Sequence, residues 1–155
     1  LIPDILRSFE KNEPVVIRNP KATRPWQHVL EPLSGYLILA EKLYKNQKEY
    51  SEGWNFGPNE QDVKPVDWIL DKMILKWPGS SWKLDKNANP HEASFLKLDI
   101  TKSKSKLGWT PVWELSHTLE KITAWHKAWL NKEDMQAVCL TEIEEYTKDM
   151  NNENR

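Results

Sequence analysis

The chain has 155 residues and a formal net charge of −1, because 22 lysines and arginines nearly balance 23 aspartates and glutamates. This balance argues against a nucleic-acid footprint or an anionic-membrane patch. No apolar run approaches the roughly 18 to 20 residues of a membrane span, and no basic-then-apolar leader is present. We therefore expect a soluble protein, and the single Cys139, which has no internal disulfide partner, suits a reducing cytoplasm.

The first 46 residues predict a helix, two short strands around a turn, and a second helix. Apolar residues at helical spacing place the first helix over residues 2–11, and the strands follow at 14–18 and 24–29 around Asn19-Pro20. Residues 32–46 predict a helix whose apolar face points toward the core. That face comprises Leu33, Tyr36, Leu37, Ala40, Leu43 and Tyr44.

The middle of the chain alternates between short strands and helices. Residues 53–58 predict a strand closed by a Gly-Pro turn, and residues 65–77 predict a helix stopped by Pro78-Gly79. A strand is expected over 81–84 and a loop over 85–90. The lysine-rich turn after Thr101 ends at Gly108, a residue suited to a left-handed C-cap.

Two further helices complete the predicted elements, one over residues 115–129 and one over 133–148. The polar tail after Met150 is expected to fray. Because strands and helices alternate along the chain, the predicted fold class is α/β.

Arg18 and Arg24 flank the predicted turn and are expected to lie close together. Planar guanidinium groups suit a phosphate or a carboxylate, because each can donate two parallel charge-assisted hydrogen bonds. The alternative is a pair of ordinary surface arginines, whose exposed ion pairs contribute only about 0 to 1 kcal/mol.

The sequence lacks the residue patterns of several common catalytic and metal-binding sites. The four histidines and Cys139 do not have the spacing of metal ligands, so no metal site is expected. The sequence contains no Gly-x-Ser-x-Gly elbow, phosphate-binding loop or Gly-x-Gly-x-x-Gly fingerprint.

Four stretches carry a resemblance to a known family. They are Arg18 to Tyr36, which contains Arg-Pro-Trp-Gln-His-Val, then Trp54 to Pro58, Pro90 to Asp99, and Lys106 to Pro111 with its Leu-Gly-Trp-Thr-Pro. Together they resemble the C-terminal half of the CDP-glucose 4,6-dehydratases, a branch of the extended short-chain dehydrogenase/reductase family of nucleotide-sugar enzymes. The last motif indicates only the superfamily, whereas Arg-Pro-Trp-Gln-His-Val is narrower and points to the CDP-sugar branch.

The resemblance implies a fragment. Residues 1–130 would form the nucleotide-sugar-binding half of a Rossmann-type enzyme, and residues 131–155 a C-terminal helix and frayed tail. The N-terminal half, which would bind NAD and carry the Tyr-x-x-x-Lys catalytic pair, would be missing, so no catalytic residue is expected here and the chain alone should be inactive. The parent would be a cytoplasmic homodimeric lyase that converts CDP-glucose to CDP-4-keto-6-deoxyglucose for surface polysaccharide such as O-antigen.

The resemblance also implies site residues. Arg24 would bind the diphosphate, Arg18 a second phosphate or the ribose, and Asn59 and His91 the nucleotide. The loop before His91 departs from the Arg-Pro-Gly-His pattern of dTDP-sugar relatives. For Arg18, Asn59 and His91 the alternative is a structural role, as a helix cap, a turn hydrogen bond or a solvated side chain. Most of the nine tryptophans are expected in the core or a subunit interface, whereas Trp26 or Trp54 could stack on a sugar or base.

Two other functions fit the same residues. The first is a different nucleotide-sugar epimerase or reductase with this C-terminal architecture. The second is a free-standing, Trp-rich binding domain without enzymatic activity.

Overall fold

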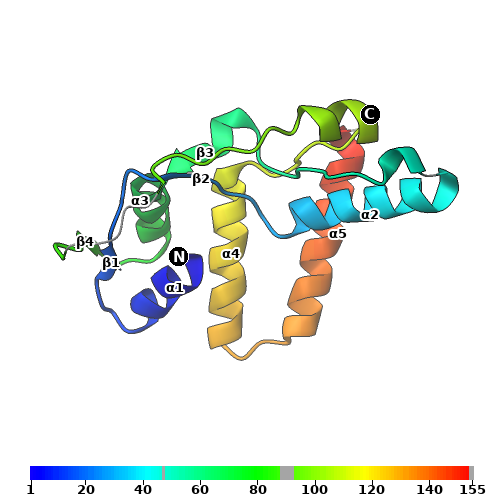
Figure 1. Cartoon of the computed structure of the whole chain (residues 1–155). Helices are drawn as coiled ribbons and strands as arrows, with labels where there is room; N and C mark the ends of the chain where they lie inside the picture. The colour runs from blue at the N-terminus through cyan, green and yellow to red at the C-terminus, as the bar shows by residue number, and fades with distance from the viewer. Residues whose placement is uncertain (47, 88–92, 154–155) are drawn as a thin grey trace.

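The computed structural model of this chain describes residues 1–46, 48–87 and 93–153 (Figure 1). The predicted site residue His91 lies outside these ranges. The helices are α1 (Ile2–Glu10), α2 (Leu30–Asn46), α3 (Val66–Lys76), α4 (Leu115–Leu130) and α5 (Met135–Glu153), with short helical turns η1 (Lys48–Tyr50), η2 (Glu60–Asp62) and η3 (Ser103–Leu107). The strands are β1 (Val15–Ile17), β2 (Thr23–Pro25), β3 (Val63–Pro65) and β4 (Trp82–Leu84).

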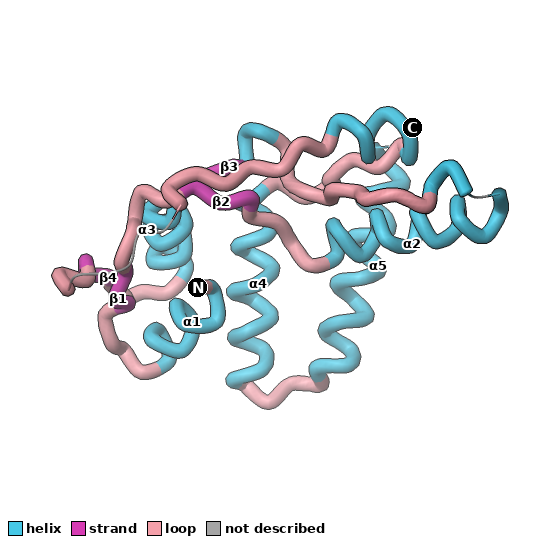
Figure 2. The backbone as a smooth tube through the Cα atoms, viewed as in Figure 1, coloured by secondary structure: helices cyan, strands magenta, loops and turns pink. Residues whose placement is uncertain are grey.

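The described strands form two small sheets. β1 pairs with β4 in parallel, with Val15 opposite Trp82, and β2 pairs with β3 in antiparallel, with Arg24 opposite Lys64. Strands β2 and β3 and the loops around them run along the upper edge of the molecule, and α3, α4 and α5 extend down from it, whereas β1 and β4 lie lower, at the left side (Figures 1 and 2). The mixture of helices and strands confirms the predicted α/β class.

The predicted strand over residues 53–58 does not form among the described residues. Its polar contacts come from side chains instead, because Gln27 Nε2 donates to the Phe56 carbonyl at 2.9 Å and Ser103 Oγ donates to the Asn55 carbonyl. A strand needs the backbone of a neighbouring strand, and no described strand lies beside this segment.

A first hydrophobic core lies between α1, β1, α3 and α4. Pro3 sits in the first turn of α1, where its missing N–H costs no helical hydrogen bond, and the helix then buries Ile5, Leu6 and Phe9. The other members of this core are Val15, Ile17, Ala22, Val66, Ile69, Leu70, Met73, Leu115 and Leu119. Asp62 Oδ1 accepts a hydrogen bond from the Leu115 backbone N–H at 3.0 Å and so stabilises the start of α4.

A second, smaller core packs against one side of α2. It consists of Phe56, Ile100, Leu107 and Trp109, with Ile38 and Leu39 of α2 packed against it. As predicted, η3 ends at Gly108, whose φ of +70° lies in the left-handed region that glycine tolerates best.

The predicted orientation of α2 is wrong. The side chains expected in the core are exposed, by 44% for Leu33, 56% for Tyr36, 73% for Leu37, 40% for Leu43 and 93% for Tyr44. The helix carries apolar residues on two sides, and the side with Ile38 and Leu39 faces the second core. Periodicity detects an apolar stripe but does not identify its neighbour, which explains the error.

A buried carboxylate holds α2 and α5 together. Glu31, which is fully buried, accepts hydrogen bonds from the backbone N–H groups of Val112 and Trp113 and, at 2.8 Å, from the Tyr146 hydroxyl. Trp113 Nε1 also donates to Asp149 Oδ2 at 2.9 Å. These contacts fix the C-terminal half of α5, which continues to Glu153 rather than ending near residue 148 as predicted.

Candidate functional site

Arg18 and Arg24, the two predicted phosphate ligands, line one cavity. It has a volume of about 300 Å³, and we call it the arginine cavity. Its lining comes from α1, β1, the turn after β1, β2 and the start of α3, and comprises Leu1, Asp4, Val15, Val16, Ile17, Arg18, Asn19, Ala22, Arg24, Trp26 and Val66.

The arginine cavity combines an apolar floor with two guanidinium groups. Val15, Ile17 and Ala22 belong to the first core and are at most 4% exposed, so the floor is rigid. Arg18 directly follows β1 and is exposed, whereas Arg24 is half-buried within β2 and its Nη1 donates to the Thr23 carbonyl at 2.9 Å. The structure therefore brings both arginines to one cavity, as the turn predicted.

Asp4 adds one negative charge to the same cavity. Its carboxylate is already engaged by Arg7 Nη1 at 2.9 Å and by the amino group of Leu1 at 3.4 Å. Arg18 and Arg24 are thus the cationic side chains of the lining, and this lining favours a small anion that two planar donors can share.

Trp26 directly follows β2 and lines the arginine cavity. Its indole Nε1 donates to the Lys64 carbonyl at 2.8 Å, and its ring packs against the first core. The hydrogen bond fixes the ring orientation, so Trp26 presents a rigid wall to the cavity.

Asn59 and Trp54 are not brought to the arginine cavity. Asn59 Oδ1 accepts a hydrogen bond from Lys104 Nζ at 2.7 Å and lines a different cavity of about 470 Å³ with Lys97 and Asp99. Trp54 donates to the Tyr50 carbonyl at 3.0 Å, and Lys102 Nζ lies 4.4 Å from the centre of its ring. Each of the two side chains therefore already has a local structural contact.

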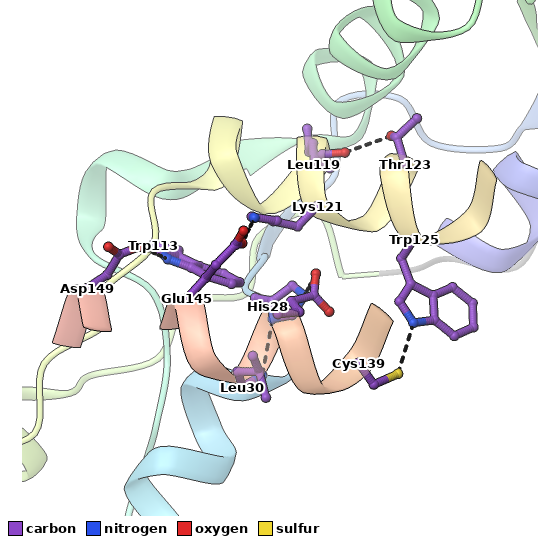
Figure 3. A network of polar contacts seen from close by, with 11 residues as sticks. His28, Leu30, Trp113, Leu119, Lys121, Thr123, Trp125, Cys139, Glu145 and Asp149 are labelled. Carbon is purple, nitrogen blue, oxygen red and sulfur yellow. Dashed lines mark hydrogen bonds and ion pairs between the residues drawn. The ribbon is translucent and has the colours of Figure 1, made fainter. Parts of the chain in front are cut away.

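A buried histidine that the sequence did not single out lies at the wall of a third cavity. This cavity, between α1 and α4, has a volume of about 660 Å³ and is mostly apolar. His28 is 4% exposed, and its Nδ1 accepts a hydrogen bond from the Leu30 N–H at 3.3 Å (Figure 3). Nε2 lies 3.7 Å from Glu142 Oε1 on α5.

Burial sets the protonation of both groups. It lowers the pKa of His28 to about 4, and the positive charges of His117 and Lys121 act in the same direction. Burial also raises the pKa of Glu142. His28 is therefore neutral near pH 7, and its position inside the Arg-Pro-Trp-Gln-His-Val motif gives no sequence signal of this burial.

The part of the chain that the structure describes also lacks two features. No group of three or more histidine, cysteine, aspartate or glutamate side chains is arranged there to hold a metal ion. Among the same residues, no helix combines the length and apolarity needed to cross a bilayer.

The fold is shared with part of a solved nucleotide-sugar enzyme. The chain matches the crystal structure of a UDP-N-acetylglucosamine 4-epimerase from Bacillus cereus with a TM-score of 0.58 and 17% sequence identity, over 81% of this chain and 42% of that one. At this identity the likeness establishes a shared fold of mixed α/β content.

The similarity in sequence to a curated protein is more specific than the similarity in fold. The chain is 55% identical, over 147 residues, to the CDP-glucose 4,6-dehydratase of Salmonella typhimurium. This similarity confirms the resemblance carried by its motifs. The match covers 94% of this chain but 41% of the relative, so the chain spans less than half the length of the curated protein. No family model matches the chain.

Proposed function

We propose that this chain is the substrate-binding part of a CDP-glucose 4,6-dehydratase and that the arginine cavity holds the diphosphate of the nucleotide sugar. The observation that carries the proposal is the meeting of Arg18 and Arg24 at one cavity in a chain that is 55% identical to such a dehydratase. Two guanidinium groups on a rigid floor match the charge and planarity of adjacent phosphates.

In this proposal the chain contributes binding and orientation. Arg24 donates to the diphosphate, Arg18 contacts a second phosphate oxygen or the ribose, and the rigid Trp26 ring is available for stacking. Binding energy from the nucleotide, which does not react, is used to orient the hexose. Asn59, Trp54 and His91 stay predictions, because the first two lie outside the arginine cavity and the third lies outside the described residues.

The residues of this chain do not fit the NAD that the family implies. Its five glycines occur singly and never in the Gly-x-Gly-x-x-Gly spacing that lets a backbone approach a pyrophosphate. We therefore assign NAD and the catalytic acid and base to the part of the enzyme outside this chain, and we expect this chain alone to lack activity. In this proposal the whole enzyme converts CDP-glucose to CDP-4-keto-6-deoxyglucose, a precursor of surface polysaccharide. It acts in the cytoplasm as a homodimer.

The test is substitution of Arg24 by alanine in the whole enzyme. Loss of a charge-assisted hydrogen bond should weaken binding of CDP-glucose by about 1.5 to 3 kcal/mol, or roughly 10- to 150-fold in Kd. Isothermal titration calorimetry measures this change directly. Lys148→Ala removes an exposed cation on α5 that does not line the arginine cavity, and it should leave the affinity unchanged.

Equal affinity of the Arg24→Ala variant and the wild type would remove this cavity from the substrate site. A second candidate function, a different nucleotide-sugar epimerase or reductase, is favoured by the fold shared with the UDP-N-acetylglucosamine 4-epimerase. The two candidates differ in the nucleotide that they recognise, so the preferred base separates them.

A further inference from the structure

The turn over residues 19–22 lies between the two arginines of the arginine cavity and is held by the first turn of α3. The Val66 N–H donates to the Ala22 carbonyl at 3.0 Å. The Asp67 N–H donates to the Pro20 carbonyl at 2.9 Å. The first N–H groups of a helix have no acceptor within the helix, so the turn supplies acceptors that α3 would otherwise lack.

The carboxylate of Asp67 makes a second connection between the helix and the turn. Its Oδ1 accepts a hydrogen bond from the Trp68 N–H at 2.9 Å, which holds the side chain at the start of α3. Its Oδ2 lies 2.6 Å from Lys21 Nζ, in the middle of the turn. The side chain of Asp67 is 16% exposed and that of Lys21 is 83% exposed, so a half-buried carboxylate anchors an exposed lysine.

The same stretch of chain also holds the strand that carries Arg24. β3 runs directly into α3 and pairs with β2, so that Lys64 lies opposite Arg24. The end of the turn is fixed from the other side as well, because Ala22 is 2% exposed in the first core. The backbone that leads from one arginine to the other therefore takes its shape from the beginning of α3.

We propose that Asp67 is a positioning residue for the arginine cavity, because it fixes the turn over residues 19–22 and thereby the separation of the Arg18 and Arg24 guanidinium groups. Among the residues that the structure describes, Asp67 is not part of the cavity lining, so it acts through the arginines. A diphosphate presents two anionic groups at a set spacing, and two planar donors bind it best when their own spacing is fixed in advance. The inference rests on the proposed function, since it takes the diphosphate as the ligand.

The sign of the effect separates positioning from direct electrostatics. Asp67 is an acid next to Val66, which lines the cavity, so removal of its charge should strengthen anion binding if charge alone mattered. Positioning predicts the opposite. For Asp67→Asn in the whole enzyme, we expect the Kd of CDP-glucose to rise by about three- to tenfold, a modest change because the lysine partner is exposed. Isothermal titration calorimetry measures it.

Asp134→Asn is the matched control. Asp134 Oδ1 accepts hydrogen bonds from the Gln136 and Ala137 N–H groups, so this variant also disturbs the start of a helix, α5, that does not line the arginine cavity. It should bind CDP-glucose with wild-type affinity. Lys21→Met removes the exposed member of the ion pair and should also raise the Kd, and it replaces Asp67→Asn if that variant fails to fold.

A double-mutant cycle shows whether the effect passes through Arg24. In the Arg24→Ala background, Asp67→Asn and Lys21→Met should each change the Kd by less than about twofold, because no separation of two guanidinium groups is left to maintain. An equal loss in both backgrounds would overturn the inference, as would an Asp67→Asn variant that binds as tightly as the wild type or more tightly.

The Arg24→Ala variant alone distinguishes this inference from the proposed function. If it binds CDP-glucose as tightly as the wild type, the proposed function is rejected and the role of Asp67 with it. If Arg24→Ala weakens binding whereas Asp67→Asn does not, the positioning role alone is rejected.

Discussion

Gly35, in the first half of α2, lets the helix pack closely against the second core because its side chain is a single hydrogen atom. A Cβ at this position would lie 2.2 Å from Phe56 Cδ1 and 2.4 Å from Cε1. The Phe56 ring has little room to move, because it packs edge-on against Trp109 with 5.1 Å between the ring centres. Only glycine allows this close approach.

We expect Gly35→Ala to destabilise the chain although alanine is the better helix former. The gain in helix propensity is about 1 kcal/mol, whereas overpacking a core costs about 1 to 3 kcal/mol and here involves three ring atoms. Urea denaturation should show the net loss. Gly53→Ala is the control, because nothing lies within 4 Å of its added Cβ. A variant at position 35 that is as stable as wild type would show that the ring yields freely.

His28 predicts a dependence of stability on pH. Its pKa is lowered to about 4 in the folded chain, against about 6.5 in an unfolded chain. Between these values the unfolded chain takes up the proton first, so stability is complete above about pH 6.5 and falls, by up to about 3 kcal/mol, as the pH drops toward 4.

Substitution of His28 by glutamine isolates this contribution. The raised pKa of Glu142, whose Oε1 lies 3.7 Å from His28 Nε2, acts in the opposite sense, because its contribution is lost as the pH rises through the folded pKa. Thermal unfolding of both proteins from pH 7 to pH 4 should show a shallower acid loss for His28→Gln. Parallel curves would mean that other groups control the acid dependence.

Residue-level reasoning from sequence succeeded where the interaction is local. Arg18 and Arg24 are six positions apart around one turn, and the structure places both at the arginine cavity. It could not determine the partner of Asn59, because Lys104 reaches that side chain from a segment 45 positions away. The burial of His28 depends on α4 and α5, which begin far along the chain, and a single motif does not contain that information.

At the scale of elements, the Tyr146 hydroxyl links α5 to the buried carboxylate of α2. Tyr146 is 4% exposed, and its hydroxyl donates to Glu31 Oε2 at 2.8 Å and lies 3.1 Å from Ser34 Oγ. We expect Tyr146→Phe to lower the free energy of unfolding by about 1 to 3 kcal/mol, because a buried carboxylate loses a donor. Faster hydrogen exchange at the α5 amides should accompany this loss.

Tyr44→Phe is the matched control for that experiment. Tyr44 is 93% exposed on α2, so loss of its hydroxyl should leave stability within about 0.5 kcal/mol of wild type. If Tyr146→Phe behaves in the same way, then the backbone donors Val112 and Trp113 satisfy Glu31 without help from α5.

The elements themselves were largely predictable, whereas their neighbours were not. Periodicity located α1, α3 and α4 because each buries one apolar stripe. For α2 the same rule selected the exposed side, since a helix with two apolar sides gives two equivalent solutions. Residues 53–58 have the composition of a strand, yet strand formation needs a neighbouring strand, and no described strand pairs with this segment.

At the scale of the whole molecule, the position of the arginine cavity determines what this chain can bind by itself. Arg18 and Arg24 both line this cavity and both belong to this chain, so the diphosphate contacts of the proposed function come from its own residues. We therefore expect this chain to bind a nucleoside diphosphate by itself.

The shared cavity of the two arginines leads to a prediction for the 155-residue chain, once circular dichroism shows that it is folded. In a calorimetric titration CDP should bind in preference to UDP, and Arg24→Ala should abolish the binding because the diphosphate carries most of the charge. Preference for UDP would favour the epimerase or reductase alternative. A folded chain that binds neither nucleotide would contradict a self-sufficient cavity, and the same titration on the whole enzyme would then show whether the site is shared between the two parts or absent.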